Sequence, residues 1–112
     1  MSREGDLREQ LCEIMKRLYM RGLISSVGGN SSVICRNEGY VLITPTGLDK
    51  MNITPRDIVK IDLDGRVLGE GKPSTESINH LSVYKTRADI KALVHAHPPT
   101  AVGMVSAGFL PH

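Results

Sequence analysis

The sequence contains no tryptophan, a single phenylalanine and three tyrosines. So few aromatic side chains cannot build the stacking platform on which proteins bind single-stranded nucleic acid. An excess of one charge is also absent: the formal net charge is +2 and no basic cluster occurs, so nucleic-acid binding is not indicated. No apolar run approaches the roughly 20 residues of a membrane-spanning helix. The polar first residues do not resemble a secretory signal. We therefore expect a cytoplasmic protein with no nucleic-acid or membrane partner.

Cysteine is scarce as well. Cys12 is expected on a helix face and Cys35 on a strand, as two reduced, partly buried thiols. Apolar residues make up 40% of the chain and charged residues 23%, which is the balance of an ordered globular protein. The 112 residues suit one domain, 1–112, or part of one.

The pattern of apolar residues predicts both helices and strands. A helix is expected over 7–21, where leucine, isoleucine and methionine recur at helical spacing before Gly22. The alternation over 32–44 predicts a β-hairpin. The further expected elements are a capped helix start at 54–57, a strand with a tight turn at 59–68, a helix at 76–87 with Ile78, Leu81 and Tyr84 on one face, a buried strand at 89–97, and a weak helix at 101–108.

The stretch "ALVHAHPP", residues 92–99, carries two histidines at the end of a predicted strand. Alternate residues of a strand point to one face, so His95 and His97 are expected side by side. Two such imidazoles can converge on one metal ion. The alternative is a pair of histidines that are only hydrogen-bonded at the end of a core strand. His80 is expected to be a surface or packing residue, and His112 is the last residue.

Three loops combine glycine N–H groups with hydroxyl side chains, which are groups that hold anions. They are "GGN" (28–30), "TPTG" (44–47) and "PSTE" (73–76). The third loop opens a predicted helix, whose N-terminus favours a phosphate. The plainer readings are a glycine turn, a strand end and a helix cap. Lys72 is the one positive charge beside these loops in the sequence, and an acid such as Glu76 is favoured in any first helical turn. Together the loops and the histidine pair predict a metal site for a phosphorylated, oxygen-rich substrate.

The order of the motifs "GGNSSV", "LITPTGLDK", "DLDG", "KPSTE" and "ALVHAHPP" resembles the N-terminal half of the class II aldolase and adducin head family. The resemblance implies that Glu76 is the catalytic acid/base and lies at the metal in the unliganded enzyme. It implies that His95 and His97 are two of three zinc ligands, although another divalent metal would also be accepted. The residues that match the family's phosphate-binding positions are Gly29, Asn30, Thr46, Gly47, Ser74 and Thr75.

The resemblance also implies a fold and a reaction. The fold is α/β, with α/β/α layers and a largely antiparallel central sheet flanked by helices. It is incomplete at the C-terminus, because family chains are longer and their third histidine lies beyond residue 112. This chain is then a fragment of a longer product or a truncated relative.

The implied enzyme is a zinc-dependent aldolase that reversibly cleaves a phosphorylated ketose through a metal-stabilised enediolate. Its active sites lie between the subunits of a homotetramer. Two alternatives stay open: an epimerase or dehydratase of a ketose phosphate, and a non-enzymatic adducin-like oligomerisation domain. The joint presence of Glu76, His95 and His97 favours an enzyme over the scaffold.

Overall fold

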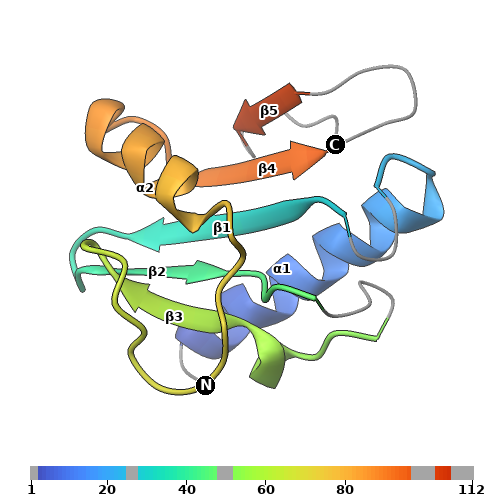
Figure 1. Cartoon of the computed structure of the whole chain (residues 1–112), viewed down its shortest axis with the longest axis horizontal. Coiled ribbons are helices and arrows are strands. Elements are labelled where there is room, and N and C mark those ends of the chain that lie inside the picture. The colour runs from blue at the N-terminus through green and yellow to red at the C-terminus, as the bar shows by residue number, and fades with distance from the viewer. Residues whose placement is uncertain (1–2, 25–27, 48–51, 97–102, 107–112) are drawn as a thin grey trace.

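The computed structural model describes residues 3–24, 28–47, 52–96 and 103–106. Its elements, in chain order, are α1 (Arg3–Met20), β1 (Asn30–Cys35), β2 (Tyr40–Ile43), the 3-10 turn η1 (Pro55–Asp57), β3 (Val59–Asp62), α2 (Ser77–Thr86), β4 (Ala92–Ala96) and β5 (Gly103–Ser106). The strands form one sheet in the order β3-β2-β1-β4-β5, and every neighbouring pair is antiparallel. Figure 1 shows α1 and α2 on opposite sides of this sheet. The predicted antiparallel sheet between helices is confirmed.

Helix α1 begins four residues before the predicted start. The apolar repeat begins only at Leu7, but the first turn carries Glu4 and Asp6, and acids are favoured at a helix N-terminus. Glu4 also accepts from Arg8 and from Lys60 of β3, each at 3.0 Å, which ties that turn to the sheet. No helix within the described ranges, α1 included, is long and apolar enough to cross a membrane.

Each face of the sheet buries its own cluster of apolar side chains. The cluster under α1 includes Leu11 and Met15 of the helix, with Tyr40 and Leu42 of β2. The alternate residues of β2 pack in the second cluster, under α2. All four residues of β2 are therefore buried, which explains why its sequence is continuously apolar rather than alternating. Both cysteines are buried and free, Cys12 on α1 and Cys35 on β1.

Helix α2 covers the other face with a different set of residues than predicted. Leu81 and Tyr84 are buried as expected, whereas Ile78 is 75% exposed. The residue at the centre of the buried face is His80, which is fully buried, so of the two expected positions, surface or packing, it occupies the packing one. At 3.6 residues per turn, Ile78 lies about 160° around the helix from His80. The apolar pattern predicts Ile78 on the buried face of α2, whereas His80 occupies the centre of that face.

The predicted helix over 101–108 is wrong. Gly103–Ser106 form β5, which pairs antiparallel with β4, Leu93 opposite Ser106 and Ala96 opposite Gly103. Glycine weakens a helix, and the β-branched Val105 is favoured in a strand. Strand β4 also offers an edge that a further strand can pair. Residues 101–102 and 107–108 of the predicted helix lie outside the described ranges.

Two local predictions around the hairpins need adjustment. The return segment after the tight turn at 64–65 makes a single bridge, Val67 opposite Ile61, rather than a strand. The capped turn at 54–57 is confirmed, since the Asp57 carboxylate accepts from the Thr54 N–H at 2.9 Å. Strand β1 begins at Asn30, two residues earlier than expected, so Asn30 is a strand residue and not a loop residue.

Candidate active site

Backbone hydrogen bonds join the second and third predicted loops to each other and to β1. The Thr46 N–H donates to the Lys72 carbonyl at 3.1 Å, and the Ser74 N–H donates to the Thr44 carbonyl at 3.0 Å. Thr44 is buried and in turn exchanges hydrogen bonds with Ser31, its N–H donating at 3.0 Å and its hydroxyl oxygen accepting at 3.2 Å. Segments far apart in the sequence thus form one cluster of loops beside the start of β1.

The first predicted loop meets this cluster next to His95. Gly29 has a φ of +83°, and a Cβ on it would lie 2.6 Å from Ile24 Cγ2 and 3.2 Å from the His95 carbonyl oxygen. Only glycine permits so close an approach to β4. The following residue, Asn30, is buried and pairs with His95 in the strand register. The first loop therefore lies against the strand that carries the predicted metal ligand.

The third loop leads into α2 and positions Glu76. The Ser74 hydroxyl oxygen accepts from the Glu76 N–H at 3.1 Å, and the Ser74 carbonyl accepts from the Ser77 N–H at 3.0 Å. Ser74 is buried while Thr75 is exposed, and Glu76 is half-buried. The Asn79 amide donates to the Glu76 carboxylate. The hydroxyl of Ser74 is thus occupied within the turn, whereas that of Thr75 faces solvent.

A chain of buried polar side chains runs between α2 and β1, and the sequence did not reveal it. His80 Nε2 lies against Asn30 Oδ1, and its Nδ1 is 2.6 Å from Ser32 Oγ. Ser32 Oγ is also 2.7 Å from the Tyr84 hydroxyl. The signal available in the sequence is the spacing of Glu76, His80 and Tyr84, which repeat every four residues and so share one helix face.

The buried chain is electrically neutral near physiological pH. The pKa of His80 is lowered from 6.5 to about 4, mainly by burial and also by the charge of His95, while the charge of Glu76 opposes the shift. Burial likewise raises the pKa of Tyr84 above its ordinary value. Because His95 and Glu76 both act on the His80 ring, the predicted acid/base and the predicted metal ligand lie in the same region.

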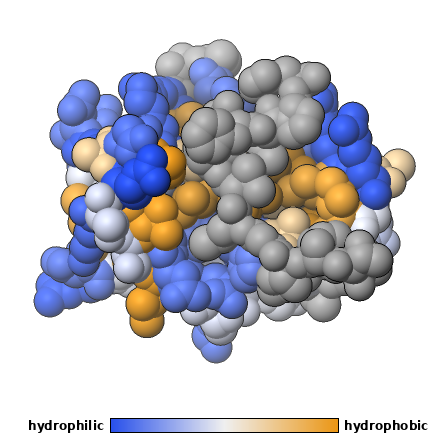
Figure 2. All heavy atoms as spheres, turned by 90° about the horizontal axis from the view of Figure 1, so that it is seen from above, coloured by the Kyte–Doolittle hydropathy of each residue, from blue (hydrophilic) through white to orange (hydrophobic). Residues whose placement is uncertain are grey.

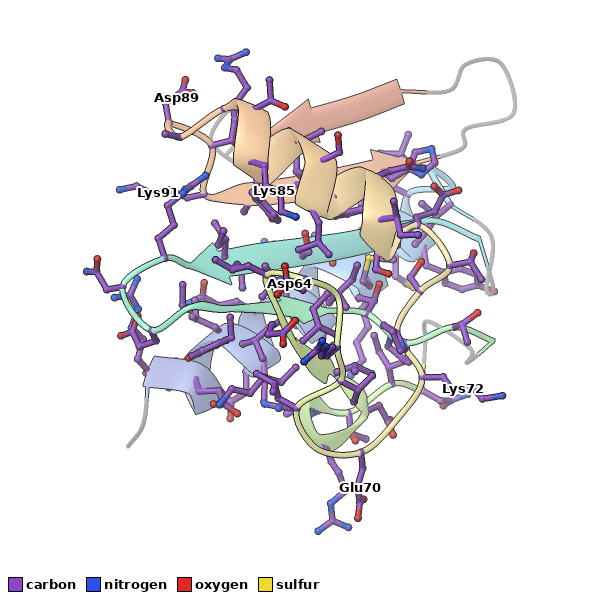
Figure 3. All side chains as sticks on the ribbon, turned by 60° about the vertical axis from the view of Figure 1, so that its left-hand side comes forward. Asp64, Glu70, Lys72, Lys85, Asp89 and Lys91 are labelled. Carbon is purple, nitrogen blue, oxygen red and sulfur yellow. The ribbon has the colours of Figure 1, made fainter. Side chains whose placement is uncertain are left out.

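A surface cavity of about 330 Å³ adjoins the second loop. Its lining includes Thr46, two cationic residues, Arg56 and Lys72, and two acidic ones, Asp57 and Glu70. Arg56 is therefore a second cation beside this loop, and its distance along the sequence gave no sign of this position. Figure 3 shows Lys72 extending away from the ribbon. The charge around this loop is mixed, and an anion here would rely on hydroxyl and backbone donors.

The residues that would hold a metal are only partly described. Within residues 3–24, 28–47, 52–96 and 103–106, no three His, Cys, Asp or Glu side chains gather as a metal site. His95 is half-buried on β4 in the region of Glu76, and His97 lies outside the described ranges. Imidazole and carboxylate are donors that zinc accepts, and a catalytic zinc usually takes three protein ligands. The donor types of His95 and Glu76 fit such a metal.

The sheet, the loop cluster and the position of Glu76 define a class II aldolase-like domain, and comparisons with known proteins agree. The family model described as Class II Aldolase and Adducin N-terminal domain matches residues 9–110. The chain belongs to this family.

Among proteins of known activity, the 5-deoxy-D-ribulose 1-phosphate aldolase of Bacillus thuringiensis serovar kurstaki is 43% identical over 103 residues, which are 91% of this chain and 48% of that protein. A probable L-ribulose-5-phosphate 4-epimerase of Mycoplasma pneumoniae is 36% identical over 105 residues, 92% of this chain and 43% of that protein. A solved structure of an L-fuculose 1-phosphate aldolase matches with a TM-score of 0.81 and 40% identity, over 88% of this chain and 46% of that one. The chain spans about half the length of these relatives, which are enzymes of the class II aldolase superfamily.

Proposed function

We propose that this chain provides part of the active site of a metal-dependent aldolase that reversibly cleaves a phosphorylated ketose. The observation that carries the proposal is the position of the three loops near Glu76 and His95. The bonds of Thr46 and Ser74 join the second loop to the third, and Gly29 of the first loop lies against the His95 carbonyl oxygen. The aldolase relatives, at 43% and 40% identity, favour cleavage over the epimerisation named for the relative at 36%.

The loops would hold the phosphate group of the substrate. The exposed hydroxyls of Thr46 and Thr75 and the backbone at Gly29 and Gly47 are suited to donate to its oxygens. Gly47 has a φ of +75°, a conformation that turns the chain at the end of this loop. Ser74 would act through the turn that it stabilises, because its N–H donates to the Thr44 carbonyl and its hydroxyl oxygen accepts from the Glu76 N–H. Fixing the phosphate places the reacting carbons of the ketose at a set distance from Glu76.

Glu76 would carry the proton. It is half-buried at the entrance of α2, and it would take a proton from a substrate hydroxyl during cleavage and return one during condensation. The Asn79 amide, which donates to its carboxylate, holds it in place.

His95, His97 and Glu76 are the residues of this chain that we propose as metal ligands. A bound Zn²⁺, or another divalent ion, supplies Lewis-acid stabilisation of the negative charge that develops on the substrate carbonyl oxygen. We further propose that the enzyme works in the cytoplasm as a homo-oligomer, a tetramer by the family resemblance.

The test is a product analysis with a panel of ketose phosphates, using the protein that carries this chain. We expect a triose phosphate and an aldehyde as products, and loss of both in His95→Ala. The matched control is Lys85→Ala, an exposed position on α2, which should behave like the unmodified protein. Formation of an epimer without any aldehyde would replace the aldolase by an epimerase, and an inactive protein with no metal would reject the proposal.

A further inference from the structure

The buried chain of polar side chains has a fixed direction because it ends at an amide oxygen. His80 Nε2 lies against Asn30 Oδ1, and an amide oxygen can only accept. The ring is therefore the donor of that bond, and Nε2 carries its proton. A neutral ring has one N–H, so Nδ1 is an acceptor.

The tautomer of His80 sets the direction of the remaining bonds. Ser32 Oγ lies 2.6 Å from His80 Nδ1 and donates its single hydroxyl proton to that nitrogen. Ser32 Oγ then accepts from the Tyr84 hydroxyl, which is 2.7 Å away. The ring is fully buried, and burial favours its neutral form, so donors and acceptors match along the whole chain.

This tautomer holds the Asn30 amide in one orientation. With Oδ1 held by His80 Nε2, the Nδ2 group is the part of the amide that Asn30 presents away from the ring. Asn30 directly follows Gly29 of the first loop and pairs with His95 in the strand register. If the Asn30 amide were reversed, it would present its oxygen, and not its NH₂ group, away from the ring, and this oxygen would repel an anion.

We propose that His80 is a positioning residue that fixes the Asn30 amide with its NH₂ group presented to the anionic oxygens of the substrate. The proposal rests on the proposed function for the identity of the anion, a phosphorylated ketose. His80 does not touch the substrate in this scheme and acts through Asn30. His80 lies one helical turn after Glu76, and its ring joins α2 to β1 through its bonds to Asn30 and Ser32.

The first experiment reads the tautomer directly, by ¹⁵N NMR of the His80 ring in the protein without any ligand. We expect a protonated Nε2 and an unprotonated Nδ1 throughout the range from pH 6 to 8. Tyr84→Phe removes the donor to Ser32 and should raise the fraction of the other tautomer. A ring with its proton on Nδ1 in the unmodified protein would overturn the proposal.

The second experiment measures the binding of inorganic phosphate by titration. His80→Leu should weaken binding at least about tenfold, the effect of losing one hydrogen bond to a charged group. His80→Gln keeps a side-chain N–H that reaches Asn30 and should recover most of the affinity. Asn30→Asp should bind phosphate more weakly than Asn30→Ala, because it replaces the donor with a negative charge. Lys85→Ala is the control for an unrelated change on α2.

The outcomes separate this proposal from the proposed function. If His80 were only a core residue, both substitutions at position 80 would lower stability and leave the phosphate affinity of the folded protein unchanged, which overturns the positioning role. If the unmodified protein shows the expected tautomer but binds no phosphate, the proposed site fails, and with it the purpose assigned to His80. The reverse tautomer with normal phosphate binding would reject the His80 proposal alone.

Discussion

Glu76 occupies a position where an acid has two possible uses, proton transfer or stabilisation of the α2 N-terminus. Glu76→Gln separates them, because glutamine keeps an oxygen for the Asn79 amide and loses the proton carrier. We predict a fall in turnover of roughly 10²–10⁴-fold with little change in phosphate affinity, measured by steady-state kinetics. If Glu76 only favours the helix start, turnover stays normal and stability changes by less than about 1 kcal/mol.

The hydroxyls of the loops differ in what they do, because they differ in burial. Thr46 and Thr75 are exposed, so Thr46→Val and Thr75→Val should leave stability nearly unchanged. We predict that each raises KM for a phosphorylated ketose much more than for its unphosphorylated analogue, by the loss of a hydrogen bond to phosphate. Equal changes for the two substrates would show that these threonines do not touch the phosphate.

Ser74 is the matched contrast within the same loop. Its buried hydroxyl accepts from the Glu76 N–H, so Ser74→Ala removes a cap before α2. We expect a loss of about 1 kcal/mol in the free energy of unfolding, measured by urea denaturation, together with a displaced Glu76. A fall in activity of this variant alone would therefore say nothing specific about phosphate.

At the scale of elements, α2 depends on a neutral histidine. The unfolded chain protonates His80 near its usual pKa of 6.5, whereas the folded chain does so only near pH 4. Between these values the unfolded state binds more protons than the folded state, so the free energy of unfolding falls as the pH is lowered from 6.5 to 4. Above pH 6.5 the contribution of His80 to that free energy is constant. The expected loss is on the order of 3 kcal/mol.

Denaturation curves at pH 7 and at pH 4.5 measure this loss. Glu76 and His95 face the same ring, so His80→Gln is the comparison that isolates it. Its stability should vary less over this window than that of the unmodified protein. An equal pH dependence in both proteins would assign the effect to other groups.

Local signals sufficed for the elements that are stabilised locally. The apolar repeat of α1, the hairpin of β1 and β2, and the capping acid Asp57 act over a few residues, and each was predicted close to its observed place. Residues 103–106 were misassigned because their pairing with β4 decides their conformation. The hydrogen bonds of His80 were not predicted because its partners, Asn30 and Ser32, lie on another element. Periodicity alone cannot show such contacts.

The candidate site was predictable to a similar extent. The expected groups lie in loops and at the ends of elements, and hydrogen bonds join the second of these loops to the third. Their roles in binding stay predictions. The occupation of the Ser74 hydroxyl and the presence of Arg56 beside Thr46 depend on the folded geometry and could not be foreseen. The pairing of His95 with His97 stays a prediction, since His97 lies outside the described residues.

At the scale of the whole molecule, the surface carries apolar side chains that suit association. Figure 2, seen from above the β5 side of Figure 1, shows hydrophobic residues between hydrophilic ones. Ile78 is 75% and Met20 71% exposed. Among the described strands, β5 pairs on one side only, and β3 is the opposite edge of the sheet. Such edges and apolar residues favour contacts between chains.

We therefore predict that residues 1–112 by themselves associate and turn over ketose phosphates poorly. Sedimentation should find oligomers, and a retro-aldol assay should find rates far below the enzyme median of about 10 s⁻¹. The physical reason for the low rate is that a catalytic zinc usually takes three protein ligands, and no three such side chains gather among the described residues. A monomer that cleaves a ketose phosphate at ordinary rates would contradict this prediction.

The strand order β3-β2-β1-β4-β5 has a consequence for how the protein folds. The first three strands are neighbours in both sequence and space, so they can pair early, whereas β4 must return across the sheet through α2 to reach β1. The contact between the first loop and β4 depends on that late pairing, since Asn30 and His95 meet only when it forms. Pulse-labelled hydrogen exchange during refolding should protect the amides of β2 and β3 before those of β4. The reacting groups would then be assembled last, on a sheet that is already built.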